Sequence, residues 1–89
     1  MKVADLKKGM WLQPEPPYRW NVIFNVSTLS VFRGSFQGKP AVSRYAIYLG
    51  QRHDLGITEP IGWSNRYCLF EGQILPVDQS DWPVIQPAK

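Results

Sequence analysis

The chain has little of what most catalytic and metal sites are built from. Its 89 residues include one cysteine, Cys68, and one histidine, His53. A zinc-type site needs several such ligands, and a cysteine nucleophile needs a base beside it. His53 next to Asp54 is the one pair that could activate Cys68, but a thiol within an apolar run is more typical of a buried residue. We therefore expect no metal, no cofactor and no enzymatic activity.

Long apolar runs and paired cysteines are lacking too. No run approaches the ~20 residues of a membrane-spanning helix, and the residues after Met1 contain no apolar segment of the secretory-signal type. Small secreted domains are usually held together by paired cysteines. The sequence therefore predicts a cytoplasmic protein with no membrane contact.

Uninterrupted stretches long enough for helices are scarce, because eight prolines and seven glycines are spread along the chain. Short apolar and β-branched runs between such residues are typical of strands. We predict one helical turn in residues 3–8 and a turn with a positive-φ glycine at Gly72. Pro76 indicates an edge strand, since proline cannot donate to a ladder. The predicted strands are residues 10–13, 19–26, 28–33, 41–49, 66–70 and 74–77, with a last edge pairing at 84–85.

Period-two alternation assigns faces to two of these strands. In residues 19–26, the set expected to point inward is Trp20, Val22, Phe24 and Val26, and the set expected to point outward is Arg19, Asn21 and Asn25. In residues 41–49, one set is Tyr45, Ile47 and Leu49, and the opposite set is Arg44, Ala46 and Tyr48. We expect Arg44 and Tyr48 to face outward.

Short strands joined by tight turns predict an all-β fold, a single domain over residues 1–89. The form that we expect is a small antiparallel SH3-like barrel of five or six short strands, with a small β-sandwich or an OB-like barrel as the alternative. Residues 5–10 read Asp5-Leu6-Lys7-Lys8-Gly9-Met10. This segment resembles the start of SH3-like barrels in some translation and regulatory proteins, and it carries over no functional residue.

Acidic residues are missing from residues 16–52, and this gap is the most informative feature of the chain. The segment holds seven aromatic residues and five basic ones: Arg19, Arg33, Lys39, Arg44 and Arg52. Residues 1–53 carry eight Lys and Arg against two acids, whereas residues 54–89 carry two against five. A basic, aromatic sheet of this kind favours a binding surface over a catalytic one.

Two kinds of partner fit such a surface. Single-stranded nucleic acid would stack on aromatic rings and pair its phosphates with arginine. A protein would use exposed aromatic residues near turns, of which the sequence offers Trp11, Tyr18, Trp63 and Trp82. Self-association through residues 10–12 or 74–77 as unprotected edges is a further alternative.

The sequence thus predicts a non-enzymatic binding or assembly module. A protein partner or a second copy of the chain is the first expectation, and nucleic acid is the alternative. The predicted binding residues are Arg19, Arg33, Arg44, Tyr48, Arg52 and Trp63.

Overall fold

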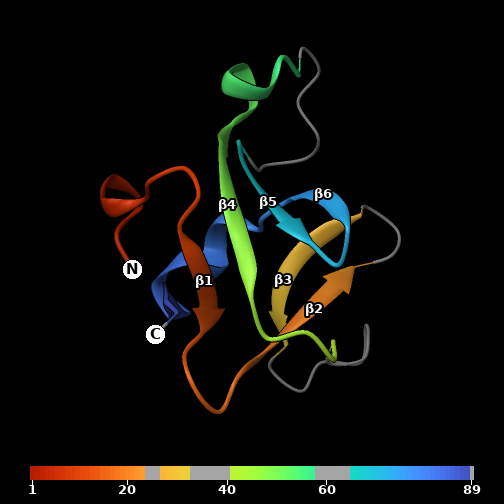
Figure 1. Ribbon diagram of the computed structural model, residues 1–89. Coiled ribbons are helices and arrows are strands. Elements are labelled where there is room, and N and C mark those ends of the chain that lie inside the picture. The colour runs from red at the N-terminus through yellow and green to blue at the C-terminus, as the bar shows by residue number, and fades with distance from the viewer. Residues whose placement is uncertain (24–26, 33–40, 58–64, 89) are drawn as a thin grey trace.

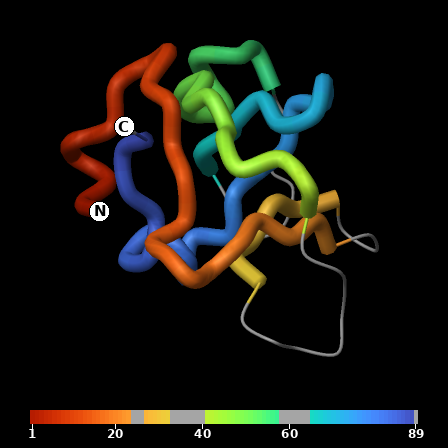
Figure 2. The backbone as a smooth tube through the Cα atoms, turned by 60° about the horizontal axis from the view of Figure 1, so that its bottom comes forward, coloured from red at the N-terminus to blue at the C-terminus, as the bar shows by residue number. Residues whose placement is uncertain are grey.

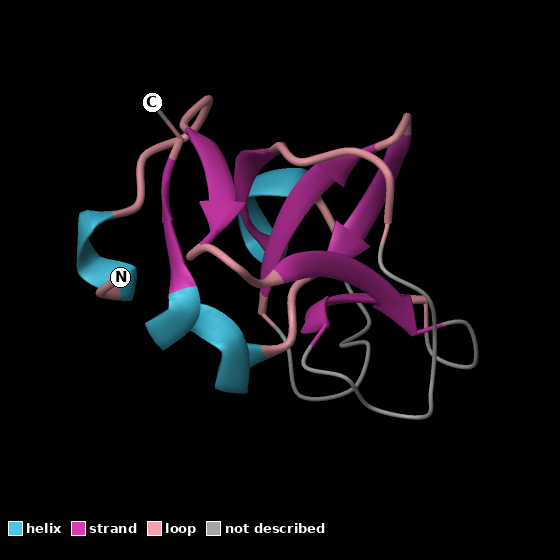
Figure 3. Cartoon of the chain, turned by 90° about the horizontal axis from the view of Figure 1, so that it is seen from below, coloured by secondary structure: helices cyan, strands magenta, loops and turns pink. Residues whose placement is uncertain are grey.

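The computed structural model describes residues 1–23, 27–32, 41–57 and 65–88, and their main elements are strands (Figure 3). The strands are β1 (Trp11–Pro14), β2 (Arg19–Ile23), β3 (Thr28–Phe32), β4 (Ala46–Gln51), β5 (Arg66–Phe70), β6 (Gln73–Pro76) and β7 (Ile85–Pro87). The helices are short 3-10 turns: η1 (Val3–Asp5), η3 (Arg52–Leu55) and η4 (Gln79–Val84). The predicted all-β class is confirmed.

The strands form two antiparallel sheets. One has five strands in the order β6-β5-β4-β1-β7, and the other is the β2-β3 hairpin. Figure 1 shows β4 in the middle of the larger sheet, with the hairpin beside its lower end. The first and last parts of the chain lie together, because β7 pairs with β1 (Figure 2).

Hydrogen bonds link the two sheets on both sides of the hairpin. Next to β3, Asp78 N–H donates to the Leu29 carbonyl (2.9 Å), and Val31 N–H donates to Asp81 Oδ2 (2.9 Å). Next to β2, Ala41 N–H donates to the Trp20 carbonyl (2.7 Å). The core therefore lies between the two sheets. These links are not a continuous ladder, and closure into an SH3-like barrel stays a prediction.

Aromatic side chains fill much of this core. Trp20 is fully buried and meets Phe70 edge to face at a centroid distance of 6.1 Å. Trp82 meets Tyr48 in the same way at 6.2 Å. Trp82 is one of the aromatic residues expected near turns, and it covers the core instead of facing solvent. The other buried apolar residues include Leu12, Leu29, Val31, Ala46, Cys68, Leu75, Val77 and Ile85.

Several turn and edge predictions agree with the structure. The β5–β6 hairpin turns at Glu71 and Gly72, which both have positive φ (49° and 78°), as a two-residue type I′ turn requires. β6, which contains Pro76, is an edge strand of the larger sheet. Residues 10–12 are not an unprotected edge, however, because β1 pairs with β4 on one side and β7 on the other.

The outward position expected for Tyr48 is wrong, since only 5 % of this residue is exposed. The alternation itself is right, because Ala46 and Tyr48 share one face of β4. That face, however, points toward the core. Asn21, also expected outward, is buried, and its Nδ2 donates to Ser30 Oγ (3.4 Å). Phe24, Asn25 and Val26 lie outside the described residues.

The strand expected over residues 41–49 begins later, at Ala46. Residues 41–44 use their backbone to hold β2 instead of extending β4, because Ala41 N–H bonds to Trp20 and the Arg44 carbonyl accepts from the Trp20 indole. The strand also ends later, since Gly50 lies within it. Gly50 has φ +124° and sits at an irregularity in the β4–β5 register, where a bulge uses a glycine.

Candidate functional site

The structure presents two candidate binding surfaces. The first is on the outer face of the five-stranded sheet, on the side away from the core. Register pairs place Trp11 opposite Ile47, Ile47 opposite Leu69, and Leu69 opposite Ile74. Directly paired residues share a face, so these side chains form a line across β1, β4, β5 and β6. We call this line, together with Tyr45, the apolar row.

Most of the apolar row is open to solvent. Trp11 is 54 % exposed, Leu69 36 % and Ile74 57 %. Tyr45 is also exposed, and its ring meets Trp11 edge to face at a centroid distance of 6.0 Å. The next residues along these strands point the other way and are buried in the core. The sheet is therefore apolar on both faces.

The strand positions on the outer face carry no charged residue, and the charged groups nearest to them are those of Lys8 and Asp54, which lie against Gly50. By alternation and register, the described positions on this face hold apolar residues and glutamines: Trp11, Gln13, Ile47, Leu49, Tyr67, Leu69, Ile74, Pro76 and Gln86. Two of these, Tyr67 and Pro76, are buried. An antiparallel sheet with one solvated face usually carries polar residues there. This face departs from that pattern.

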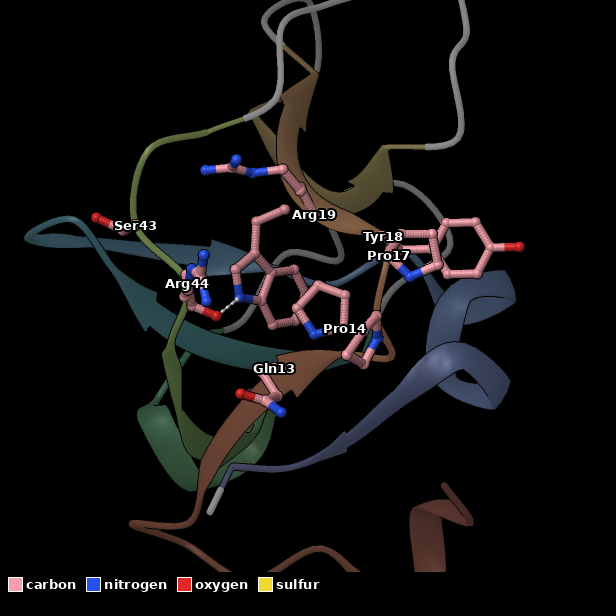
Figure 4. Close-up of a pocket in the computed structure, with 9 residues that line it drawn as sticks. Gln13, Pro14, Pro17, Tyr18, Arg19, Ser43 and Arg44 are labelled. Atoms are coloured by element: carbon pink, nitrogen blue, oxygen red, sulfur yellow. Dashed lines mark hydrogen bonds between the residues drawn. The ribbon is translucent and has the colours of Figure 1, made fainter.

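The second surface is a pocket of about 230 Å³ where β1 runs into β2. We call it the arginine pocket, and it is lined by Gln13, Pro14, Pro16, Pro17, Tyr18, Arg19, Trp20, Ser43 and Arg44. The proline-rich loop after β1 supplies one part of the lining, and the segment before β4 supplies another. Figure 4 shows Arg19, Ser43 and Arg44 on one side, with Pro14, Pro17 and Tyr18 on the other.

The pocket brings together two of the six residues predicted to bind a partner. Arg19 and Arg44 both line it and are both exposed. Tyr48 lies in the core. Arg52 begins η3 at the far end of β4 (Figure 1), about 20 Å away at the rise of a strand. Arg33 and Trp63 lie outside the described residues.

Sequence reasoning missed Leu69 and Ile74 as surface residues. A signal was present in residues 66–70, where the Tyr67-Cys68-Leu69-Phe70 run is apolar at every position. Such a run indicates a strand with apolar side chains on both faces. The sequence does not reveal that one of those faces is left open.

A catalytic thiol, which the sequence did not favour, is not supported by the surroundings of Cys68 either. The thiol is free and buried, and burial raises its pKa to about 12. A thiol with that pKa stays protonated near neutral pH, whereas the thiolate is the nucleophile. Burial also raises the pKa of Tyr48.

His53 and Asp54 lie in η3, on the surface. Asp54 Oδ2 accepts from Gln51 N–H (3.0 Å), and Asp54 Oδ1 lies 3.2 Å from Lys8 Nζ and 3.6 Å from His53 Nε2. The Gln51 hydrogen bond, followed by Lys8, lowers the pKa of Asp54. Because Gln51 and Asp54 cap each other's backbone, the Asp54 carboxylate has a structural use at the end of β4.

In the described part of the chain, no three His, Cys, Asp or Glu residues gather in a way that could hold a metal ion. The helices in that part are all too short to cross a membrane.

Comparison with known proteins finds no match to any protein-family model, to any curated protein or to any solved structure. What the protein binds must therefore be inferred from the chemistry of its surfaces.

Proposed function

We propose that the protein is a non-enzymatic binding and assembly module that docks protein against its apolar row. The observation that carries this proposal is the line of exposed and half-buried apolar side chains across four strands, none of which is charged. Contiguous exposed apolar patches usually mark sites of interaction. Tryptophan and tyrosine, which stand together at one end of the row, are common at the energetic centres of interfaces.

The partner that we propose for this face is a second copy of the chain. The chain carries a net charge of +3, so two copies repel weakly at long range. The apolar row contains no charged residue, so two copies can meet along it without bringing like charges directly together. A two-fold axis between Leu69 and Ile47 would place Ile74 of one copy against Trp11 of the other. Such a self-complementary contact is the usual geometry of a homodimer.

The size of the face sets the expected strength. Five strands spaced at about 4.8 Å, each about four residues long, cover about 300 Å² in projection. A stable interface usually buries about 800 Å² on each partner, which is about one seventh of the 5899 Å² surface of this chain. The sheet face supplies only part of that area. We therefore expect a weak, reversible dimer with a dissociation constant on the order of 10–1000 µM.

Sedimentation velocity over a concentration series tests this proposal. The wild-type chain should sediment faster as its concentration rises. Leu69→Lys puts a charge at the middle of the row, where docking would bury it without a partner, and should weaken association at least about tenfold. The matched control is Val42→Lys, which replaces an apolar residue that is 86 % exposed and lies outside the strands.

The control variant should associate like the wild type. A wild-type chain that remains monomeric at every concentration would contradict the proposal. An equal effect of the two lysine substitutions would also contradict it, because added charge alone would then explain the result.

The same proposal includes an SH3-like arrangement of the sheets and a cytoplasmic location. An SH3-like arrangement of the sheets is supported by the bridge between Leu29 and Val77 on one side and the Ala41–Trp20 hydrogen bond on the other. A cytoplasmic location is supported by the free thiol of Cys68, since cytosolic thiols are kept reduced.

A further inference from the structure

The arginine pocket has a wall that is fixed before any ligand arrives. Three hydrogen bonds hold residues 41–44 against β2: Ala41 N–H to the Trp20 carbonyl (2.7 Å), Arg19 Nη2 to the Ala41 carbonyl (3.2 Å) and Trp20 Nε1 to the Arg44 carbonyl (2.8 Å). The last of these is drawn as the dashed line in Figure 4. A ligand that enters the pocket therefore meets a preformed site and does not have to order it.

This wall carries positive charge, and no described residue forms an ion pair with it. Arg19 and Arg44 line the pocket, and the described lining contains no acidic residue. A guanidinium has five N–H donors. Arg19 gives one hydrogen bond to Ala41, and within the described ranges the Arg44 side chain has no hydrogen-bond or ion-pair partner. Both guanidinium groups thus keep donors for an anionic ligand.

The opposite wall is apolar and stiff. Pro14, Pro17 and Tyr18 form it (Figure 4), and Tyr18 is 40 % exposed. Proline and tyrosine side chains present apolar surface at a low cost in conformational entropy. The pocket therefore offers an anion site and an apolar surface to neighbouring parts of one ligand.

The size of the pocket limits what that ligand can be. Pockets that enclose small molecules usually measure about 300–1,000 Å³, whereas this one measures about 230 Å³. Such a volume suits a single anchoring side chain. A carboxylate is the side-chain group that accepts paired hydrogen bonds from arginine.

We infer that the arginine pocket binds one acidic side chain of an extended peptide segment, held by Arg44 and Arg19. The apolar residue next to that acid packs on Tyr18 and Pro17. This goes beyond the proposed function, because it concerns a different part of the surface and a partner recognised by charge. It does not require the chain to self-associate.

Single-stranded nucleic acid fits the pocket less well. Such strands are usually held by several stacking aromatic residues along a basic groove. In the described lining, Trp20 is fully buried and Tyr18 is the exposed aromatic residue. Arg52, which was expected on the same surface, lies at the other end of β4.

The test is a titration of the isotope-labelled full chain, followed by NMR. The probe is a capped pentapeptide with a central glutamate flanked by proline and leucine, and its counterpart has glutamine at the centre. The glutamate peptide should bind with a dissociation constant on the order of 0.1–1 mM and more weakly as salt is raised. The glutamine peptide should bind at least about tenfold more weakly.

Arg44→Gln should weaken binding of the glutamate peptide about tenfold or more, because it removes a charged donor. Arg52→Gln is the matched control, since it removes the same charge from the far end of β4, and it should bind like the wild type. Thermal melting of each variant checks that it is folded. Leu69→Lys should also bind the peptide normally, which separates this inference from the proposed self-association.

Equal affinity for the glutamate and glutamine peptides would overturn the inference, as would equal losses in Arg44→Gln and Arg52→Gln. A labelled single-stranded oligonucleotide forms the third arm of the experiment. Tighter binding of the oligonucleotide than of the glutamate peptide, lost in Arg44→Gln, would assign the pocket to nucleic acid instead.

Discussion

At the scale of single residues, Trp20 connects the core to the arginine pocket. Its ring packs on Phe70 in the core, and its indole N–H holds the Arg44 carbonyl at 2.8 Å. One side chain therefore stabilises the fold and also positions a wall of the pocket. A change at Trp20 should affect both.

We expect Trp20→Ala to lower the free energy of unfolding by about 3–5 kcal/mol, because it opens a large cavity in the core. Trp20→Phe should cost less, about 1–3 kcal/mol, since it removes the hydrogen bond to Arg44 but leaves a smaller cavity than alanine does. Urea denaturation measures both. Trp11→Ala is the control, because Trp11 lies on the outer face, and it should cost less than about 1 kcal/mol. A Trp20→Ala protein as stable as Trp11→Ala would show that Trp20 is not a core residue.

Asp54 should make stability depend on pH in acid. Its pKa is lowered in the folded protein, first by the Gln51 hydrogen bond and then by Lys8, from an ordinary value of 3.8. The folded state therefore binds fewer protons than the unfolded state near this pH. The stabilisation is fully present above the unfolded pKa and is lost as the pH falls through the lower folded pKa.

Urea unfolding at pH values from about 6 to about 2.5 measures this dependence. Asp54→Asn keeps an oxygen that can accept from Gln51 N–H but cannot titrate. The variant should lose less stability than the wild type over this range. Identical pH profiles would mean that Asp54 does not contribute.

Residue patterns in the sequence predicted some positions well. They identified Cys68 and Trp20 as buried. They also placed Tyr45, Ile47 and Leu49 on one face of a strand and the residues between them on the opposite face. They did not show which set faces the core. Both sets are largely apolar, so burial could not be decided from residue type alone, and Tyr48 was placed on the wrong side.

At the scale of elements, the irregularity at Gly50 determines how β4 ends. Gly50 has φ +124°, and a Cβ there would lie 2.9 Å from Asp54 Oδ2 and 3.1 Å from Lys8 Cε. A side chain would therefore be strained by its backbone and would press on the Lys8–Asp54 pair. Glycine at the bulge avoids both effects where the strand meets η3.

Gly50→Ala should lower the free energy of unfolding by about 1–3 kcal/mol. Gly9→Ala is a matched control, because Gly9 also has positive φ (+86°) but a Cβ there meets nothing within 4 Å. It should cost about 1 kcal/mol, from backbone strain alone. Chemical denaturation of the two variants gives the difference. A smaller loss for Gly50→Ala than for Gly9→Ala would contradict the close contact.

Element positions were predictable where local chemistry decides them. Gly72 marked the β5–β6 turn, and Pro76 marked an edge strand. The start of β4 was not predictable, because residues 41–44 are bound by distant partners on β2. The Trp20 indole lies 24 positions away in sequence from the carbonyl that it binds, so no local pattern signals it.

At the scale of the whole molecule, the two surfaces differ in kind. The apolar row has no charged residue, whereas the arginine pocket combines positive charge with proline and tyrosine. Neither was visible as a surface in the sequence, because each depends on register or on long-range contacts. The basic character of residues 16–52 was visible in the sequence. It was the reason for predicting Arg19 and Arg44 as binding residues, and both line the arginine pocket.

The central claim is that two copies of the chain meet through the apolar row. The most direct measurement is a dilution series of the isotope-labelled chain by NMR, which reports each described residue separately. On concentration, we predict shifts or broadening at the backbone amides of Leu69 and Ile74 and at the Trp11 indole, with little change at Arg19 or Arg44. Changes confined to residues away from the row, or no change at any concentration, would contradict the claim.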